Sequence, residues 1–237
     1  MQKALAQDFL TLTGTTLTEQ QSEALAVYAQ ELRDWNQRYS LTAIRNAEKI
    51  RVKHLLDSLS AHLVMMNTPI IRIIDVGTGA GFPGLPLKIL WPHLQLTLVE
   101  SVEKKVRFCQ HVVDKLSLEN VQIVRDRAEV LGRQDEHREQ YDWAVARAVA
   151  QMPILMEYLL PFVRVGGRAL AMKGDTGPTE VHAAEQAITL LGGRLSQITP
   201  VELPGVVEER YLVVIDKVVT TPEKYPRRTG IPSKRPL

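Results

Sequence analysis

The feature that most constrains the fold is a glycine-rich turn that follows an apolar run. Residues 70–74 are apolar apart from Arg72, and the run ends in the acidic Asp75. Residues 76–86 then hold alternating glycines at 77, 79 and 81 and prolines at 83 and 86. An apolar run of this kind predicts a buried parallel strand, and prolines in a first turn predict the start of a helix. Glycine allows positive φ and a close approach to a ligand. The turn therefore predicts a strand, a binding loop and a helix.

The spacing of the glycines differs from that of a dinucleotide-binding fingerprint. The third glycine of that fingerprint would fall at position 82, which is Phe82. Asp75 would also repel a pyrophosphate at the ligand end of the strand and attract a cation. S-adenosylmethionine carries an ammonium and a sulfonium group and no phosphate. The sequence around Gly77 and Gly79 thus resembles the first motif of the class I methyltransferases, and we expect Asp75, Gly77 and Gly79 to bind that cofactor.

A second acidic residue indicates a ligand that contains a ribose. Residues 94–99 form another apolar run, which ends at Glu100. A carboxylate at this strand end can accept hydrogen bonds from both ribose hydroxyls. Nicotinamide cofactors and S-adenosylmethionine share this mode of binding. Glu100 therefore predicts an adenosine-bearing cofactor without choosing between the two.

The pattern divides the chain into three parts. Helical signals dominate residues 1–68, where Thr18 begins a capping box. Strands and helices alternate over residues 69–217, the expected methyltransferase domain. Residues 218–237 form a tail with five basic residues, one acidic residue and four prolines. The prolines exclude a long helix, so the tail is either an extended clamp on phosphates or a solvated terminus.

The alternation predicts a mostly parallel sheet. The predicted strands are residues 70–75, 94–99, 121–125, 141–146, 168–173, 194–201 and 210–217, and the predicted helices between them are 83–91, 102–116, 127–131, 153–163 and 178–191. The last two strands have no helix between them and should pair antiparallel. We therefore expect an α/β, Rossmann-like class I S-adenosylmethionine-dependent methyltransferase fold with an antiparallel last strand and an N-terminal helical extension.

Composition limits the function only weakly. The 237 residues are 45% hydrophobic and 24% charged, which is ordinary for a globular protein. The sequence shows neither an apolar run long enough for a membrane span nor a leader pattern. We therefore expect a cytoplasmic protein without a membrane partner. The single cysteine, Cys109, excludes an internal disulfide and a cysteine-rich zinc site, and we expect no metal.

The residues after the third and fourth strands bear on the cofactor and on the methylated atom. Ala128 and Glu129 lie where an adenine should sit, although Glu129 suits the first turn of a helix equally well.

Residues 146–149 lack the Asn/Asp-Pro-Pro-aromatic turn that polarises an adenine amine. Methylation of a pyrimidine carbon needs a cysteine nucleophile, and Cys109 lies in the middle of a predicted helix. Methylation of guanine at nitrogen 7 needs neither the amine-polarising turn nor a cysteine nucleophile, because positioning of the base alone can supply most of the catalysis. No catalytic residue is assigned.

Several motifs together resemble the RsmG (GidB) family. They lie at residues 35–36, 41–44, 53–58, 75–84, 105–108, 126–129, 146–150, 172–174 and 225–232, nearly the length of the chain. Ser40 departs from the family, which usually has asparagine there. The resemblance implies methylation of a guanine at nitrogen 7 in small-subunit ribosomal RNA, near the decoding site, on naked RNA or on the ribosomal subunit. It also implies cofactor contacts at Gly77, Phe82, Ala128, Glu129 and Arg147.

The residues alone leave several alternatives open. The chain could instead methylate a small molecule or a protein, or it could be a nicotinamide-dependent oxidoreductase. Arg147 has three possible roles: a bidentate bond to the cofactor's carboxylate, a contact with RNA, or an ion pair that stabilises the strand end. The tail and the pair Lys53 and His54 are candidates for RNA contact.

Overall fold

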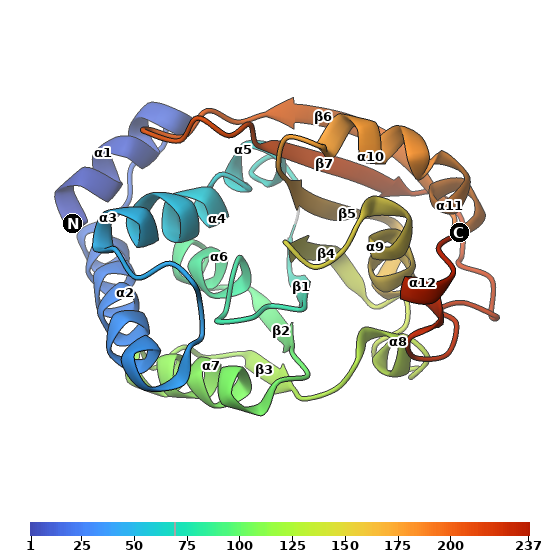
Figure 1. Ribbon diagram of the computed structural model, residues 1–237, viewed down its shortest axis with the longest axis horizontal. Coiled ribbons are helices and arrows are strands. Elements are labelled where there is room, and N and C mark those ends of the chain that lie inside the picture. Colours follow the sequence, from blue (N-terminus) through green and yellow to red (C-terminus); the bar gives the residue numbers. More distant parts are fainter. Residues whose placement is uncertain (69) are drawn as a thin grey trace.

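The computed structural model describes residues 1–68 and 70–237, which form a seven-stranded sheet with helices on both faces (Figure 1). The strands are β1 (Arg72–Val76), β2 (Gln95–Val99), β3 (Val121–Val124), β4 (Tyr141–Arg147), β5 (Val163–Lys173), β6 (Gly193–Pro200) and β7 (Tyr211–Lys217). Their order is β3-β2-β1-β4-β5-β7-β6, and only the pairs that include β7 are antiparallel. The expected α/β class I methyltransferase fold is confirmed.

The helices follow the predicted pattern with local differences. They are α1 (Gln2–Thr13), α2 (Glu19–Tyr39), α3 (Ala47–Ile50), the π-helix η1 (Arg51–Leu56), α4 (Asp57–Leu59), α5 (His62–Met65), α6 (Gly84–Leu90), α7 (Glu103–Lys115), α8 (Ala128–Leu131), α9 (Met152–Leu159), the 3-10 helix η2 (Leu160–Phe162), α10 (Gly177–Ala183), α11 (Glu185–Leu190) and α12 (Ile231–Lys234). The helix expected at 178–191 is divided at Ala184. No helix in the described part of the chain is long and apolar enough to cross a bilayer.

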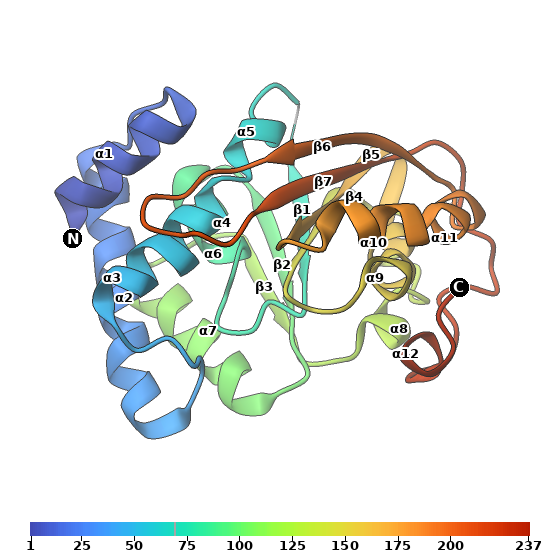
Figure 2. The same cartoon turned by 45° about the horizontal axis from the view of Figure 1, so that its top comes forward.

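Both faces of the sheet are buried, and successive strand residues contribute to opposite faces. In β1, Ile73 packs with α2, α6 and α7, whereas Ile74 packs with α9 and α11. Side chains alternate along a strand, so an unbroken apolar strand requires cover on both faces. Figure 2 shows these two helical layers on either side of the strands.

The N-terminal helices pack directly against the glycine loop and its helix. Thr18 and Gln21 form the predicted capping box, with hydrogen bonds of 2.8 and 3.1 Å. The side chain of Gln21 also donates to the carbonyl of Leu90 at 2.8 Å. Two turns further along α2, the Tyr28 hydroxyl donates to the carbonyl of Ala80. The boundary expected at residue 69 lies outside the described residues.

The tail is packed against the protein over much of its length. Arg138 donates to the carbonyl oxygens of Thr221 and Tyr225, each at 2.7 Å. Arg227 forms an ion pair with Glu157 on α9. In Figure 1 the dark red segment that carries α12 accordingly lies between α8 and α9.

Replacing Tyr28 with Phe should lower the free energy of unfolding by about 1 kcal/mol, because Ala80 loses a buried hydrogen-bond donor while the ring still packs. Urea unfolding of both proteins measures this difference. Tyr39→Phe is the control, since Tyr39 lies on the same helix and is 47% exposed. Equal losses in the two variants would show that the Tyr28 hydroxyl adds nothing to stability.

Candidate functional site

The glycine loop between β1 and α6 is shaped by the buried carboxylate of Asp75. Its Oδ2 atom accepts hydrogen bonds from the Thr78 hydroxyl at 2.6 Å and from the Gly84 amide at 2.7 Å. A Cβ atom at Gly84 would lie 2.8 Å from the same oxygen, so the helix can begin this close only with glycine. These contacts join the end of the strand to the start of the helix.

The second oxygen of Asp75, Oδ1, is buried and has no hydrogen-bond partner among residues 1–68 and 70–237. Burial raises the pKa of Asp75 to about 7, although hydrogen bonds from Thr78 and Gly84 and the charge of Arg147 act in the opposite direction. A buried oxygen without a partner is costly. Asp75 is fully buried and is absent from the walls of the cavities at this edge of the sheet, so its observed contacts hold the loop in place.

A cavity of about 90 Å³ lies at the carboxyl ends of β1, β2 and β3. Its wall contains Gly77, Glu100, Ala128 and Glu129, four of the eight residues that the sequence predicts for the cofactor. The carboxyl ends of parallel strands share one edge of the sheet, which brings these distant residues together.

Glu100 connects the glycine loop to the start of α7. One carboxylate oxygen accepts from the Gly79 amide at 3.0 Å, and the other accepts from the Val102 amide at 2.8 Å. Each oxygen retains a lone pair for a ligand hydroxyl. Gly79 has a φ of 62°, and an added Cβ atom would meet nothing within 4 Å. The space beside Gly79 and Glu100 is thus open and fits an adenosine-bearing ligand.

The far wall of this small cavity comes from two residues that sequence reasoning did not assign to the site. Val149 follows β4, and Tyr158 belongs to α9. A Cβ atom at Gly77 would lie 2.8 Å from the Val149 side chain, so packing as well as a φ of 68° requires glycine there. The Glu129 carboxylate accepts a hydrogen bond at 3.0 Å from the Gly230 amide of the tail. Val149 lies within the family motif at residues 146–150, whereas Tyr158 lies in none of the motifs.

A second cavity, of about 350 Å³, lies on the other side of the end of β4. The charged side chains in its wall are Lys53, Asp57, Arg147, Lys173, Glu180 and Arg210. Ala148 lines this larger cavity with a φ of 54°, and the next residue, Val149, lines the smaller one. The turn at Ala148 therefore separates the two cavities.

Arg147 lines the larger cavity and connects β4 to the N-terminal helices. Its guanidinium donates to Asp57 at 2.6 Å and to the carbonyl of Lys53 at 2.9 Å. It also lies 5.1 Å from the centre of the Phe82 ring. The ion pair considered among the roles of Arg147 is thus present. Its partner Asp57 was not identified from the sequence, although it lies within one of the family motifs.

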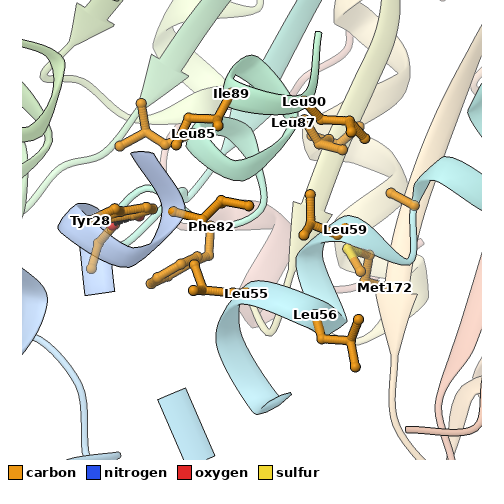
Figure 3. Packing of buried hydrophobic residues seen from close by; sticks show 14 of the residues in the cluster. Tyr28, Leu55, Leu56, Leu59, Phe82, Leu85, Leu87, Ile89, Leu90 and Met172 are labelled. Atoms are coloured by element: carbon orange, nitrogen blue, oxygen red, sulfur yellow. Dashed lines mark hydrogen bonds between the residues drawn. The ribbon is translucent and has the colours of Figure 1, made fainter. Parts of the chain in front are cut away.

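Phe82 is buried in an aromatic stack. Its ring centre lies 5.1 Å from that of Tyr28 and 4.7 Å from that of His54, and Figure 3 shows the Tyr28 and Phe82 side chains next to each other near α6. The side chain is 5% exposed and is absent from the walls of both cavities. A cofactor contact at Phe82 would therefore have to come from its main chain.

His54 is held uncharged beside this stack. Burial and the neighbouring charge of Arg147 lower the pKa of His54 to about 3. Its ring nitrogens lie 2.9 Å from the Thr42 hydroxyl and 3.2 Å from the Arg147 guanidinium. His54 therefore supplies no positive charge to an RNA phosphate at neutral pH.

Cys109 is a packing residue of α7. It is fully buried, and burial raises the pKa of its thiol, so the thiol remains protonated. A protonated buried thiol is a poor nucleophile. In the described portion of the chain, no group of three His, Cys, Asp or Glu side chains is placed to hold a metal ion.

Comparisons with known proteins identify relatives over nearly the whole chain. A sequence profile of the GidB family, described as rRNA small subunit methyltransferase G, matches residues 21–210. Ribosomal RNA small subunit methyltransferase G of Roseiflexus castenholzii is 54% identical over 224 residues, which are 94% of this chain and 95% of the relative. The protein of the same name from Alkaliphilus metalliredigens is 44% identical over 235 residues, or 99% and 98% of the two chains.

Solved structures show the likeness of the fold at much lower identity. The crystal structure of TrmN from Thermus thermophilus matches with a TM-score of 0.53 and 19% identity. The match covers 68% of this chain and 48% of that one.

Gly79→Val should abolish binding of S-adenosylhomocysteine while the protein remains folded, because the new side chain would enter open space and not the core. The positive φ adds a strain of about 1–2 kcal/mol. Calorimetric titration measures binding, and circular dichroism measures folding. Gly205→Val is the matched control, since Gly205 has a φ of 68° and equally open surroundings. Near-normal affinity in folded Gly79→Val protein would refute the assignment of the loop.

Glu100→Ala should weaken cofactor binding by about 1.5–3 kcal/mol, the usual contribution of hydrogen bonds to a charged group. Titration with S-adenosylhomocysteine measures the change, and thermal unfolding reports separately on the lost bonds to Gly79 and Val102. Glu103→Ala is the control because Glu103 is an exposed acid on the first turn of α7. An unchanged dissociation constant would make Glu100 a purely structural residue.

Proposed function

This chain belongs to the GidB family of small-subunit ribosomal RNA methyltransferases, and we propose that it uses S-adenosylmethionine to methylate nitrogen 7 of a guanine near the decoding site. The protein is thus an rRNA methyltransferase, and the proposal concerns its methyl donor, the modified atom and the target region. S-adenosylmethionine supplies an electrophilic methyl group on a sulfonium. Gly77, Gly79, Glu100, Ala128 and Glu129 would hold it, with the buried carboxylate of Asp75 beneath the loop.

The choice of nitrogen 7 rests on one observation: the titratable side chains of the larger cavity already have ion-pair or hydrogen-bond partners. The Lys173 ammonium lies 2.6 Å from Glu180, and Asp57 is paired with Arg147. His54 is neutral, and its ring nitrogens are close to Thr42 and Arg147. Among the described residues this cavity therefore offers no free general base. Nitrogen 7 of guanine carries an available lone pair and needs no proton removed before attack, so positioning beside the methyl donor suffices.

The larger cavity has four basic and two acidic side chains in its wall, and ion pairs within it limit the repulsion of a cationic product. Methylation at nitrogen 7 makes the base cationic, so an uncompensated guanidinium against it would oppose the reaction. Arg147 has its charge balanced by Asp57 at 2.6 Å, and the second acid, Glu180, balances Lys173. The acids therefore reduce the repulsion between the wall and the product.

The near full-length relatives favour ribosomal RNA over the other substrates that the sequence left open. The proposed cytoplasmic location follows from this substrate, because small subunits are assembled there. For contacts with RNA phosphates we propose Lys53 and the exposed tail residues Lys224, Arg228 and Lys234. Arg227 is not available for this role, because its guanidinium is paired with Glu157.

The proposal is tested by mass mapping of small-subunit ribosomal RNA from cells with and without the gene. We expect one guanosine to lose a methyl group when the gene is deleted and to regain it when the gene is restored. Chain cleavage specific for 7-methylguanosine identifies the methylated atom. Loss of a methyl group from another base or another atom would contradict the proposal, and so would an unchanged map.

Arg147→Ala should raise the dissociation constant for S-adenosylhomocysteine by the equivalent of about 1.5–3 kcal/mol, because we assign to Arg147 a bond with the cofactor's carboxylate. Titration in the absence of RNA measures this effect. Arg210→Ala is the comparison, since Arg210 lines the same cavity and its Nε atom lies 3.9 Å from the other oxygen of Asp57. Normal cofactor affinity together with lost RNA binding in Arg147→Ala would place this residue in the RNA site instead.

A further inference from the structure

Arg227 anchors the tail to a buried carboxylate beside the small cavity. The main-chain amide of Arg227 donates to Glu157 at 2.7 Å, and its guanidinium donates to both carboxylate oxygens at 2.6–3.1 Å. Glu157 is completely buried on α9. A buried carboxylate depends strongly on such a partner, because without it the charge would be left uncompensated. The ion pair therefore fixes the tail to α9 at this point.

The anchor is connected to the small cavity in two ways. Glu157 is followed directly by Tyr158, which lines that cavity. Three residues beyond Arg227, the Gly230 amide donates to Glu129 at 3.0 Å, and Glu129 lines the same cavity. Glu129 is only 5% exposed. The tail thus contacts the cavity wall from outside, through α8 and through α9.

We propose that Arg227 is a positioning residue for the cofactor: by holding the tail on Glu157, it keeps the Gly230 amide against Glu129 and so fixes the wall where the adenine binds. This inference rests on the proposed cofactor. With one oxygen of Glu129 occupied by Gly230, the carboxylate is held in one orientation and its remaining lone pairs can accept from the adenine amine. When the tail is released, this carboxylate loses its donor and its fixed orientation.

The contacts of Arg227 differ from those of the other basic residues in the tail. Its guanidinium is charge-balanced and only 24% exposed, whereas Lys224, Arg228 and Lys234 are exposed. Arg227 therefore adds little to the attraction of phosphates, which depends on net positive charge. The tail combines an anchor for the cofactor site with exposed residues suited to RNA.

The test is the affinity for S-adenosylhomocysteine in the absence of RNA. Arg227→Ala should raise the dissociation constant about tenfold, the effect of losing one hydrogen bond to a charged group. Arg227→Lys should recover part of the affinity, because it retains the charge but not the planar fork. Arg164→Ala is the matched control. Arg164 donates to Asp142 at 2.8 Å, and both residues lie at the starts of their strands, away from the carboxyl ends that form the site. This control variant should lower the melting temperature without changing the dissociation constant.

Two further measurements separate positioning from general stability. Glu157→Gln removes the charge that holds the tail while keeping both Arg227 and Gly230, and it leaves no uncompensated buried carboxylate, so it should also weaken binding. Because coupling is reciprocal, S-adenosylhomocysteine should slow hydrogen exchange at the Gly230 amide of the unaltered protein. Unchanged affinity in folded Arg227→Ala and Glu157→Gln overturns the inference and leaves the proposed function standing. Failure of the unaltered protein to bind S-adenosylhomocysteine would overturn the proposed cofactor and this inference together.

Discussion

The hydrogen bonds to one buried oxygen, Asp75 Oδ2, determine the geometry on which the rest of the site depends. They join the end of β1 to the start of α6 and so fix the glycine loop between them. Other parts of the protein then attach to that loop. Glu100 accepts from its Gly79 amide, and Tyr28 donates to its Ala80 carbonyl. A displacement of the loop would therefore disturb both the expected ribose contact and the docking of the N-terminal helices.

The N-terminal helices form part of the site as well as covering the sheet. The π-helix η1 supplies the Lys53 carbonyl and is followed at once by Asp57, and both hold the Arg147 guanidinium at the end of β4. π-Helical turns are rare and frequently occur at functional sites. Here the turn helps to form the wall of the larger cavity. The arginine at the junction of the two cavities is thus oriented by a segment outside the sheet.

Local signals and strand order explain what could be predicted from the sequence. The capping box at Thr18 depends on neighbouring residues only. Gly77, Glu100, Ala128 and Glu129 could be expected together because consecutive parallel strands end at one edge of the sheet. Each of these inferences needed only the pattern along the chain and a general rule of α/β topology.

Contacts between distant segments explain what could not be predicted. Arg147 pairs with Asp57 across 90 positions, and Arg227 pairs with Glu157 across 70. Neither ion pair produces a periodic pattern in the sequence. The family motif that contains Asp57 therefore did not indicate its pairing with Arg147. Phe82 follows the glycine loop as expected, but Tyr28 and His54 bury its ring. The tail could likewise be interpreted as basic and proline-rich, yet its sequence does not reveal which arginine is paired with a buried acid.

The contact between Gly230 and Glu129 also gives the site an order of completion during synthesis. Chains emerge from the ribosome with their N-terminal part first, so the glycine loop, Glu100 and Glu129 are all made before the tail that holds Glu129 in place. A nascent chain can form the sheet through β7 while the wall of the small cavity at Glu129 still lacks its outer support. If Glu129 binds the adenine as proposed, the wall of that site therefore gains its outer support only after residues 227–230 have left the exit tunnel.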